Sequence, residues 1–181
     1  MRHVLDTDRL RLREMTMDDA DSLLRIFSDP VAMQYYPSTK NADQTRQWIE
    51  WTLANYRQQG CGLWIVLRRA DGEFLGQCGV VPMDVNGTFA FEVGYLFVRA
   101  VWGHGYATEA ARACRDWGFR HLDTDSLISL PDSRNQPSIR VAQRMGMSLR
   151  ARIVWHGKDT DVYGITREQW AAASEPPGRP G

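Results

Sequence analysis

The spacing of apolar residues changes along the chain, and each change predicts a different element. Residues 9–13 alternate between polar and apolar, which is typical of a strand with one solvated face. Apolar residues three and four apart then predict one helix over residues 20–27 and a second that begins at Asn41 and ends at Gly60. Two helices are therefore expected directly after the first strand.

Three strand-like runs follow in the middle of the chain, over residues 63–69, 74–83 and 88–98. The turns between them contain Asp-Gly at 71–72 and Asn-Gly at 86–87, which are strong signals for β-hairpins. We therefore expect an antiparallel meander in this region.

The second half of the chain brings back helical spacing. It predicts a helix over 106–121, a strand over 126–130, a helix over 137–145 and a last hairpin over 147–156 and 161–167. The whole order predicts an α+β fold, with one mostly antiparallel sheet of about seven strands flanked by about four helices. Its single strand–helix–strand unit predicts a right-handed parallel crossover.

The domain organisation predicted from length is simple. A chain of 181 residues is long enough for one domain with a substantial core, and we assign that domain to residues 1–173. Residues 174–181 contain three prolines and two glycines, so a flexible tail is expected there.

Composition and charge exclude several classes of function. Lys and Arg together number 22, as do Asp and Glu, so the chain lacks the basic excess that is usual in proteins bound to nucleic acid. The mean hydropathy is −0.43, and no apolar run approaches the roughly 20 residues of a membrane span. We expect neither a nucleic-acid partner nor a membrane partner. Only two of the 22 basic residues, Lys40 and Lys158, are lysines.

The cysteines and the N-terminus bear on compartment and metal content. Cys61, Cys78 and Cys114 are odd in number and widely spaced, which disfavours a disulfide framework or a zinc site. No metal is therefore expected. The first residues lack the apolar segment of a signal peptide, so a cytoplasmic protein is predicted.

The most informative stretch is the pair Gly103 and Gly105, which lies between a predicted strand and a predicted helix. Glycines let a ligand approach backbone amides, and a helix N-terminus offers free N–H groups and a partial positive charge that suit a phosphate. A turn needed only for chain geometry would explain the same glycines. A P-loop is excluded because no Gly-Lys-Ser/Thr tripeptide occurs, and a dinucleotide fingerprint because Thr108 occupies the place of its third glycine.

Residues 102–110 resemble the acetyl-CoA-binding loop of the GNAT family of N-acetyltransferases, with the ribosomal-protein N-acetyltransferase-like (RimJ/RimL) group as the nearest branch. The resemblance covers nearly the whole chain and includes residues 7–13, 91–95, 135–147 and 163–170. It implies an enzyme that transfers acetyl from acetyl-CoA to a primary amine by direct attack in a ternary complex. The amine could belong to a protein N-terminus or to a small molecule, and a homodimer is a family-level expectation.

The resemblance also implies which residues bind acetyl-CoA, the co-substrate. The pantetheine arm would pair with free backbone groups at Leu96, Phe97 and Val98 and contact Asn135. The pyrophosphate would lie on the amides of Gly103, His104, Gly105, Ala107 and Thr108. Ser138 would lie near the sulfur and donate a proton or hydrogen bond to the leaving thiolate. Plain capping of a helix by Asn135 is the alternative.

Glu92 is the candidate general base, because the reaction needs a neutral amine. The strand from Thr88 carries bulky residues on one face, which we expect to be the core face: Phe89, Phe91, Val93, Tyr95 and Phe97. Glu92 lies on the other face among small residues, which leaves room for a ligand. Burial there would raise its pKa toward neutrality, although a solvated strand carboxylate is the simpler interpretation.

Some positions depart from the family pattern or stay open. Ala100 replaces an Arg or Gln, His104 replaces a Lys, Arg or Gln, and Ala142 stands where many relatives carry a Tyr acid. These departures keep a second hypothesis open, a catalytically weak CoA-binding sensor or interaction module. The candidates for lining an acceptor pocket, or for plain packing, are Tyr35, Tyr36 and Trp48.

Overall fold

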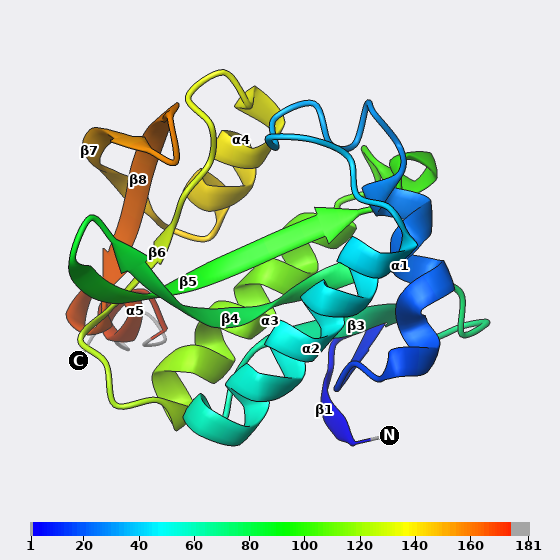
Figure 1. Cartoon of the computed structure of the whole chain (residues 1–181). Coiled ribbons are helices and arrows are strands. Elements are labelled where there is room, and N and C mark those ends of the chain that lie inside the picture. Colours follow the sequence, from blue (N-terminus) through cyan, green and yellow to red (C-terminus); the bar gives the residue numbers. More distant parts are fainter. Residues whose placement is uncertain (1, 175–181) are drawn as a thin grey trace.

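The computed structural model describes residues 2–174, which form one eight-stranded sheet with helices on both faces (Figure 1). The strands are β1 (His3–Asp6), β2 (Leu10–Arg13), β3 (Leu63–Arg68), β4 (Phe74–Val85), β5 (Thr88–Phe97), β6 (Ser126–Ser129), β7 (Ser148–Trp155) and β8 (Lys158–Thr166). The helices are α1 (Ala20–Phe27), α2 (Ala42–Gln59), α3 (Tyr106–His121), α4 (Gln136–Arg144) and α5 (Arg167–Ser174), with 3₁₀ turns at Met17–Asp19 and Arg99–Val101.

The strand order is β1-β2-β3-β4-β5-β6-β8-β7. Neighbouring strands are antiparallel except β5 and β6, which are parallel and joined through α3. The predicted α+β fold and its parallel crossover are confirmed. Of the predicted tail, all but Ser174 lies outside the described residues.

Two short elements were not predicted from the sequence, which is why the structure has eight strands and five helices. The strand β1 pairs His3 with Arg13 but spans only four residues without a clear alternation. The helix α5 begins directly where β8 ends. Its signal is a capping box, because Thr166 and Gln169 each donate a backbone N–H to the other's side-chain oxygen.

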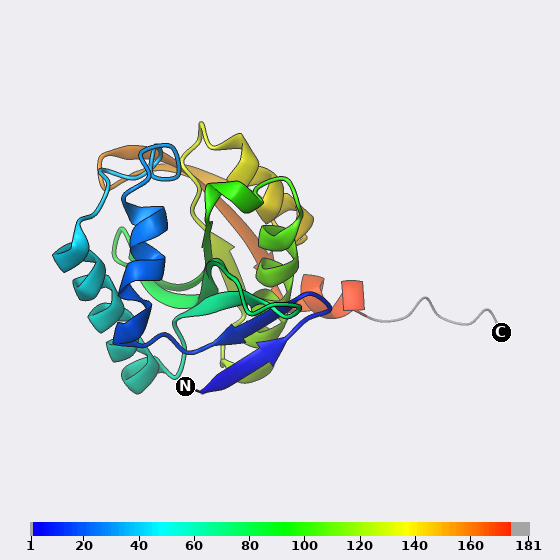
Figure 2. The ribbon, with the colours of Figure 1, turned by 90° about the vertical axis from the view of Figure 1, so that its right-hand side faces the viewer.

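The helices form two layers. In Figure 2 the sheet separates α1 and α2 on one side from α3 and α4 on the other. Close packing explains a glycine inside α3, since a Cβ on Gly118 would lie 3.0 Å from Leu127 and 3.4 Å from Val80. This close contact packs the C-terminal half of α3 directly against β4 and β6.

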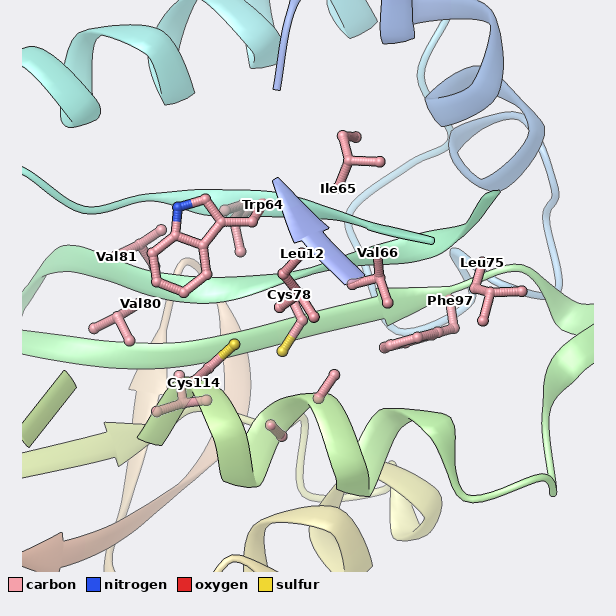
Figure 3. Packing of buried hydrophobic residues seen from close by; sticks show 14 of the residues in the cluster. Leu12, Trp64, Ile65, Val66, Leu75, Cys78, Val80, Val81, Phe97 and Cys114 are labelled. Atoms are coloured by element: carbon pink, nitrogen blue, oxygen red, sulfur yellow. The ribbon is translucent and has the colours of Figure 1, made fainter. Parts of the chain in front are cut away.

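The core lies on both faces of the sheet: α1 and α2 bury residues such as Leu23, Phe27 and Ile49 on one face, and Figure 3 shows the part toward α3 on the other. Trp64 and Val66 of β3 point toward α3, and Ile65 points to the opposite side of the sheet. Cys78 and Cys114 are fully buried between β4 and α3. Both are therefore small core residues, as free buried cysteines commonly are.

Candidate active site

The sheet opens where β5 and β6 separate. The pairing of β5 with β4 is continuous from Val85 and Thr88 to Gly76 and Phe97, but β5 and β6 are in register only at Glu92 and Ile128. Beyond that point β5 has an open edge. The N-terminal part of α4 and the loop between α1 and α2 lie at this end of β5 (Figure 1).

Two adjoining cavities lie at the opening. The first has a volume of about 440 Å³ and lies between the end of β5, the loop before α3, and α4. The second, of about 370 Å³, lies beside it and contains Glu92. The residues shared by both linings mark the junction: Tyr35, Tyr36, Tyr95, Leu96, Asn135 and Ser138.

The loop before α3 is shaped by its two glycines. Gly103 and Gly105 both have φ of +81°, a conformation that other residues adopt only with strain. A Cβ on Gly103 would meet nothing within 4 Å, so the requirement for glycine is conformational rather than steric. The loop aims the first turn of α3 at the first cavity, which Gly103, Gly105, Ala107 and Thr108 line.

His104 is placed differently from its neighbours. It does not line either cavity, and its Nδ1 lies 3.0 Å from the carbonyl oxygen of Trp102 within the same loop. The ring also stacks on Tyr106 at 6.1 Å. The side chain of His104 is bonded within the loop, so the contact predicted between His104 and the cofactor would have to come from its backbone amide.

Thr7 and Arg9, from the segment between β1 and β2, hold this loop in place, a role that was not predicted from the sequence. The carboxylate of Glu109 accepts hydrogen bonds from Thr7 Oγ1 at 2.6 Å and from Arg9 Nε at 2.6 Å. Arg9 also donates to the carbonyl oxygen of His104 at 3.1 Å. Partial burial opposes ionisation of Glu109, but the bonds from Thr7 and Arg9 outweigh it and lower its pKa. Thr7 and Arg9 thus hold the loop against α3.

The open edge of β5 requires one correction. Val98 donates its N–H to the carbonyl oxygen of Leu75 at 2.9 Å, so it is not free for a ligand. In an antiparallel pair, residues that bond the neighbouring strand alternate with residues whose backbone faces away from it. Leu96 therefore also directs its backbone toward β4, whereas Tyr95 and Phe97 face the open edge. The carbonyl oxygen of Phe97 already accepts a hydrogen bond of 3.0 Å from Trp102 Nε1, so only its N–H is left on this edge. Leu96 and Phe97 are part of the lining of the first cavity, and Val98 is not.

Glu92 lines the second cavity in a half-buried position. Burial raises its pKa to about 7, against a smaller opposing effect of a backbone hydrogen bond from Leu130. The carboxyl group thus ionises near neutral pH, in the range that suits a general base.

The prediction that Phe89, Phe91, Val93, Tyr95 and Phe97 form the core face of β5 is correct at the C-terminal end of the strand and wrong at its N-terminal end. Val93 is fully buried and Phe97 is 4% exposed, as expected of the core face. Phe89 is 62% exposed and packs edge-on against Phe91 at 5.1 Å. Phe89 follows the β4–β5 turn at the far end of the strand, where the core has ended.

Tyr95 is a site residue that the sequence did not single out. Its hydroxyl donates to the carbonyl oxygen of Ser138 at 2.8 Å and accepts from Ser138 Oγ at 3.2 Å. Burial raises the pKa of Tyr95 to about 12, although hydrogen bonds with Ser129 and Ser138 act against it. Tyr instead of Phe at an expected core position was the available signal, because a buried phenol needs a partner.

Further residues singled out from the sequence are Asn135, Trp48, Tyr35, Tyr36 and Ala142, and all but Ala142 line a cavity. Asn135 caps α4 by accepting the N–H of Ser138 at 3.1 Å, and it also lines both cavities. Trp48 lines the second cavity together with Tyr35 and Tyr36, in agreement with their candidacy. Ala142 is fully buried in the core, away from both cavities.

The first cavity fits acetyl-CoA. Unbonded amides of the first turn of α3 suit a pyrophosphate, and Arg140 and Arg144 of α4 add positive charge to the same lining. The open edge of β5 suits an extended amide chain. Within residues 2–174, no group of three or more His, Cys, Asp or Glu side chains is placed to hold a metal ion. No helix in that part of the chain is long and apolar enough to cross a membrane.

Comparison with known proteins gives consistent matches. Residues 9–148 match the family described as acetyltransferase (GNAT) domain. The uncharacterized protein YkkB of Bacillus subtilis (strain 168) is 44% identical over 160 residues, which cover 88% of this chain and 93% of YkkB. The uncharacterized N-acetyltransferase p20 of Bacillus licheniformis is 30% identical over 165 residues, with coverage of 88% and 92%.

Solved structures show the same fold. An acetyltransferase from Agrobacterium tumefaciens str. C58 superposes with a TM-score of 0.81 at 28% identity and covers 92% of this chain and 95% of its own. RimL, a ribosomal L7/L12 α-N-protein acetyltransferase solved with coenzyme A, gives a TM-score of 0.75 at 16% identity, with coverage of 91% and 98%. The family match over residues 9–148 confirms the resemblance carried by the loop motif, and the chain belongs to the GNAT family of N-acetyltransferases.

Proposed function

We propose that the protein transfers acetyl from acetyl-CoA directly to a primary amine, with both substrates bound at once. One observation carries the proposal: two cavities meet at Tyr95 and Ser138, and the second contains a carboxyl group with a pKa of about 7. A ternary complex needs two adjoining spaces of this kind, and direct transfer needs a base on the acceptor side.

The first cavity is the proposed binding site for acetyl-CoA, which supplies the acetyl group as an activated thioester. Backbone amides from Gly103 to Thr108 would bind the pyrophosphate, with Arg140 and Arg144 close by. The backbone of Tyr95 and the N–H of Phe97 would pair with the pantetheine arm, since the carbonyl oxygen of Phe97 is bonded to Trp102. Most of this binding depends on main-chain groups, which explains how Ala100 and His104 can replace the side chains usual in the family.

Glu92 is the proposed general base. Primary amines have pKa values of about 8 to 10.4 and are mostly protonated at neutral pH. Glu92, directly or through a water, takes a proton from the amine nitrogen as that nitrogen bonds to the acetyl carbon and the C–S bond breaks. A base with a pKa near the working pH combines a large ionised fraction with useful basicity.

Tyr95 and Ser138 are the proposed hydrogen-bond donors to the leaving thiolate. Both hydroxyls lie at the junction of the cavities, and each can turn from its present partner toward a sulfur there. A thiol has a pKa near 8.5, so the thiolate leaves readily and needs only modest help. This pair would serve where Ala142 supplies no acid.

The test is an assay of thiol release from acetyl-CoA with a panel of primary amines, with the acetylated product identified by mass spectrometry. We expect saturable, amine-dependent release. Saturable binding of acetyl-CoA without release above the amine-free rate would overturn the proposal and favour a CoA-binding sensor.

A further inference from the structure

Both lysines of the chain line the second cavity. Lys40 comes from the loop before α2 and Lys158 from the start of β8, 118 positions later in the sequence. Lys158 donates to the carbonyl oxygen of Tyr35 at 2.5 Å and so ties β8 to the α1–α2 loop. Figure 2 shows this loop and the β7–β8 hairpin at the same end of the molecule.

The two ammonium groups are not neutralised within the cavity. In the described part of the chain, neither lysine has a carboxylate oxygen within 4.0 Å. The carboxylates in the lining are Glu92 and Asp132. Arg134 takes up Asp132 with bonds of 2.8 and 2.9 Å, and Lys158 acts on Asp132 only as a more distant charge that lowers its pKa.

This charge pattern is wrong for a simple amine. A free amine is mostly a cation when it arrives, and two ammonium groups in a partly desolvated cavity repel it. Among the described residues, Glu92 is the one carboxylate of this lining without an ion pair, whereas a site for a plain cationic acceptor would be lined by several. An anionic group on the acceptor itself removes the conflict and gives the lysines a partner.

The walls of the cavity are aromatic. Trp48 and Trp51 lie 5.0 Å apart, and the Nζ of Lys40 lies 5.5 Å from the ring of Trp48. Trp48 is fixed by a bond of 3.0 Å from its Nε1 to Gln77 Oε1. A volume of about 370 Å³ is in the range of small-molecule sites. Flat apolar walls with two cations suit a small organic anion.

We propose that the acceptor is a small molecule that carries a carboxylate or phosphate beside its primary amine. The anionic group binds Lys40 and Lys158, and the amine faces Glu92. Lys158 keeps two further N–H donors after its bond to Tyr35, which are available for this role. The inference rests on the proposed function, because it names the acceptor of the same reaction.

The test compares primary amines with and without an added anionic group, with each rate corrected for the fraction of amine that is neutral at the assay pH. Phenylalanine is compared with phenylalaninamide and phenethylamine for a carboxylate, and O-phosphoserine with serine for a phosphate. We expect kcat/KM at pH 8 to favour an anionic member by about tenfold or more, the size of one charge-assisted hydrogen bond. The pair that shows the preference identifies the anion.

Variants locate the effect. Lys40→Gln and Lys158→Gln should each raise KM for the anionic amine about tenfold and leave its neutral counterpart and acetyl-CoA almost unchanged. Lys158→Arg keeps the charge and should restore most of the preference. Arg57→Gln is the matched control, since it removes a positive charge from α2 outside both cavities.

The outcomes separate this inference from the proposed function. Thiol release that is equal for anionic and neutral amines, or restricted to peptide N-termini regardless of their charge, overturns the inference and leaves the acetyltransferase in place. Equal losses for both amines in the lysine variants also overturn it. Calorimetric binding of the anionic amine to the protein–CoA complex, lost in both Gln variants but without turnover on any amine, would show that Lys40 and Lys158 bind the anion. It would overturn the proposed function and, with it, the role of the bound amine as acceptor.

Discussion

The two adjoining cavities are built in different ways. The first depends on the main chain: two glycines with positive φ, the first turn of α3 and the open edge of β5. The second depends on side chains from separate segments, among them Lys40, Trp48, Glu92 and Lys158. A main-chain site is preserved whenever the fold is preserved, whereas a side-chain site changes with each substitution.

The difference explains how one fold can accept many amines. RimL shares the fold at 16% identity, which leaves ample room for different side chains on a common backbone. Substitutions in the first cavity should therefore act mainly on acetyl-CoA binding. Substitutions in the second should act on the amine and on the proton that it loses.

The largest expected effect is on catalysis by Glu92. Glu92→Gln should lower kcat by roughly 10²–10⁴-fold, the usual contribution of a general base, and leave KM for acetyl-CoA almost unchanged. Wild-type kcat/KM should rise with pH through about 7 as Glu92 loses its proton. The variant should follow only the ionisation of the amine.

Rates from about pH 6 to 9, a range that brackets a tuned base, decide this prediction. Glu50→Gln is the matched control, since Glu50 is an exposed residue of α2 outside both cavities. Superimposed pH profiles for wild type and Glu92→Gln would show that Glu92 has a structural role. The general base would then have to be another group in the second cavity or the solvent.

The same carboxyl group should reduce stability at high pH. Its pKa is about 7 in the folded protein against 4.5 when solvated, so the folded state binds the proton more tightly. The contribution of Glu92 to the free energy of unfolding should be most favourable below pH 4.5, fall between 4.5 and 7, and then level off. The total change corresponds to about 3 kcal/mol.

Denaturant unfolding of wild type and Glu92→Gln at about pH 5 and pH 8 measures this effect. The variant has no charge to desolvate, so its advantage should grow toward pH 8, up to about 3 kcal/mol. A difference that is the same at both pH values would mean that Glu92 is effectively solvated. The ionised carboxylate of Glu92 in the second cavity would then not destabilise the folded state.

An intermediate effect is expected in the first cavity. Gly103→Ala and Gly105→Ala should each raise KM for acetyl-CoA about tenfold, because a left-handed conformation costs a non-glycine residue about 1–2 kcal/mol. With no steric clash at Gly103, the loop should relax away from the conformation that presents its amides. The value of kcat at saturation should change little.

Gly60→Ala is the control for strain alone. Gly60 ends α2 with φ of +69°, a Cβ on it would meet nothing within 4 Å, and it lies outside both cavities. The variant should lose comparable stability without any change in KM. Unchanged acetyl-CoA affinity in a folded double variant of Gly103 and Gly105 would remove the loop from the proposed site.

The same contrast explains what could be predicted from the sequence. The loop at Gly103 and Gly105 is contiguous, so its glycines and the following helix are visible in one short stretch. Glu92 was found because strand alternation places it among small residues. The pairing of Arg9 with Glu109 and the presence of Lys40 and Lys158 in one cavity depend on long-range packing, which no local spacing encodes.

Errors in the fold prediction have the same origin. Phe89 fits the alternation of its strand, yet the core ends before it, and only the tertiary structure sets that limit. Tyr95 was assigned to the core by the same alternation. That assignment holds, since Tyr95 packs against the core. The alternation could not show that its hydroxyl also reaches Ser138, because that contact depends on α4, 43 positions later in the sequence, which closes over the end of β5.

The smallest expected effect concerns Tyr95 at the junction of the cavities. Tyr95→Phe removes a hydroxyl that both donates to and accepts from Ser138. A thiolate leaves without an acid, so kcat should fall only about tenfold, below the usual range for acid catalysis. Ser138→Ala should cause a similar or smaller loss. If the two hydroxyls act as one unit on the sulfur, the fold-loss of kcat in the double variant should be smaller than the product of the two single fold-losses. Measurement of kcat with saturating acetyl-CoA for wild type, the two single variants and the double variant tests this coupling.

The leaving group offers a second test of Tyr95. A more basic leaving group depends more on a hydrogen-bond donor, so a matched oxygen-ester analogue of acetyl-CoA should widen the difference in kcat between wild type and Tyr95→Phe. Independent losses that do not respond to the leaving group would assign Tyr95 to packing, and the junction would then belong to the first cavity alone.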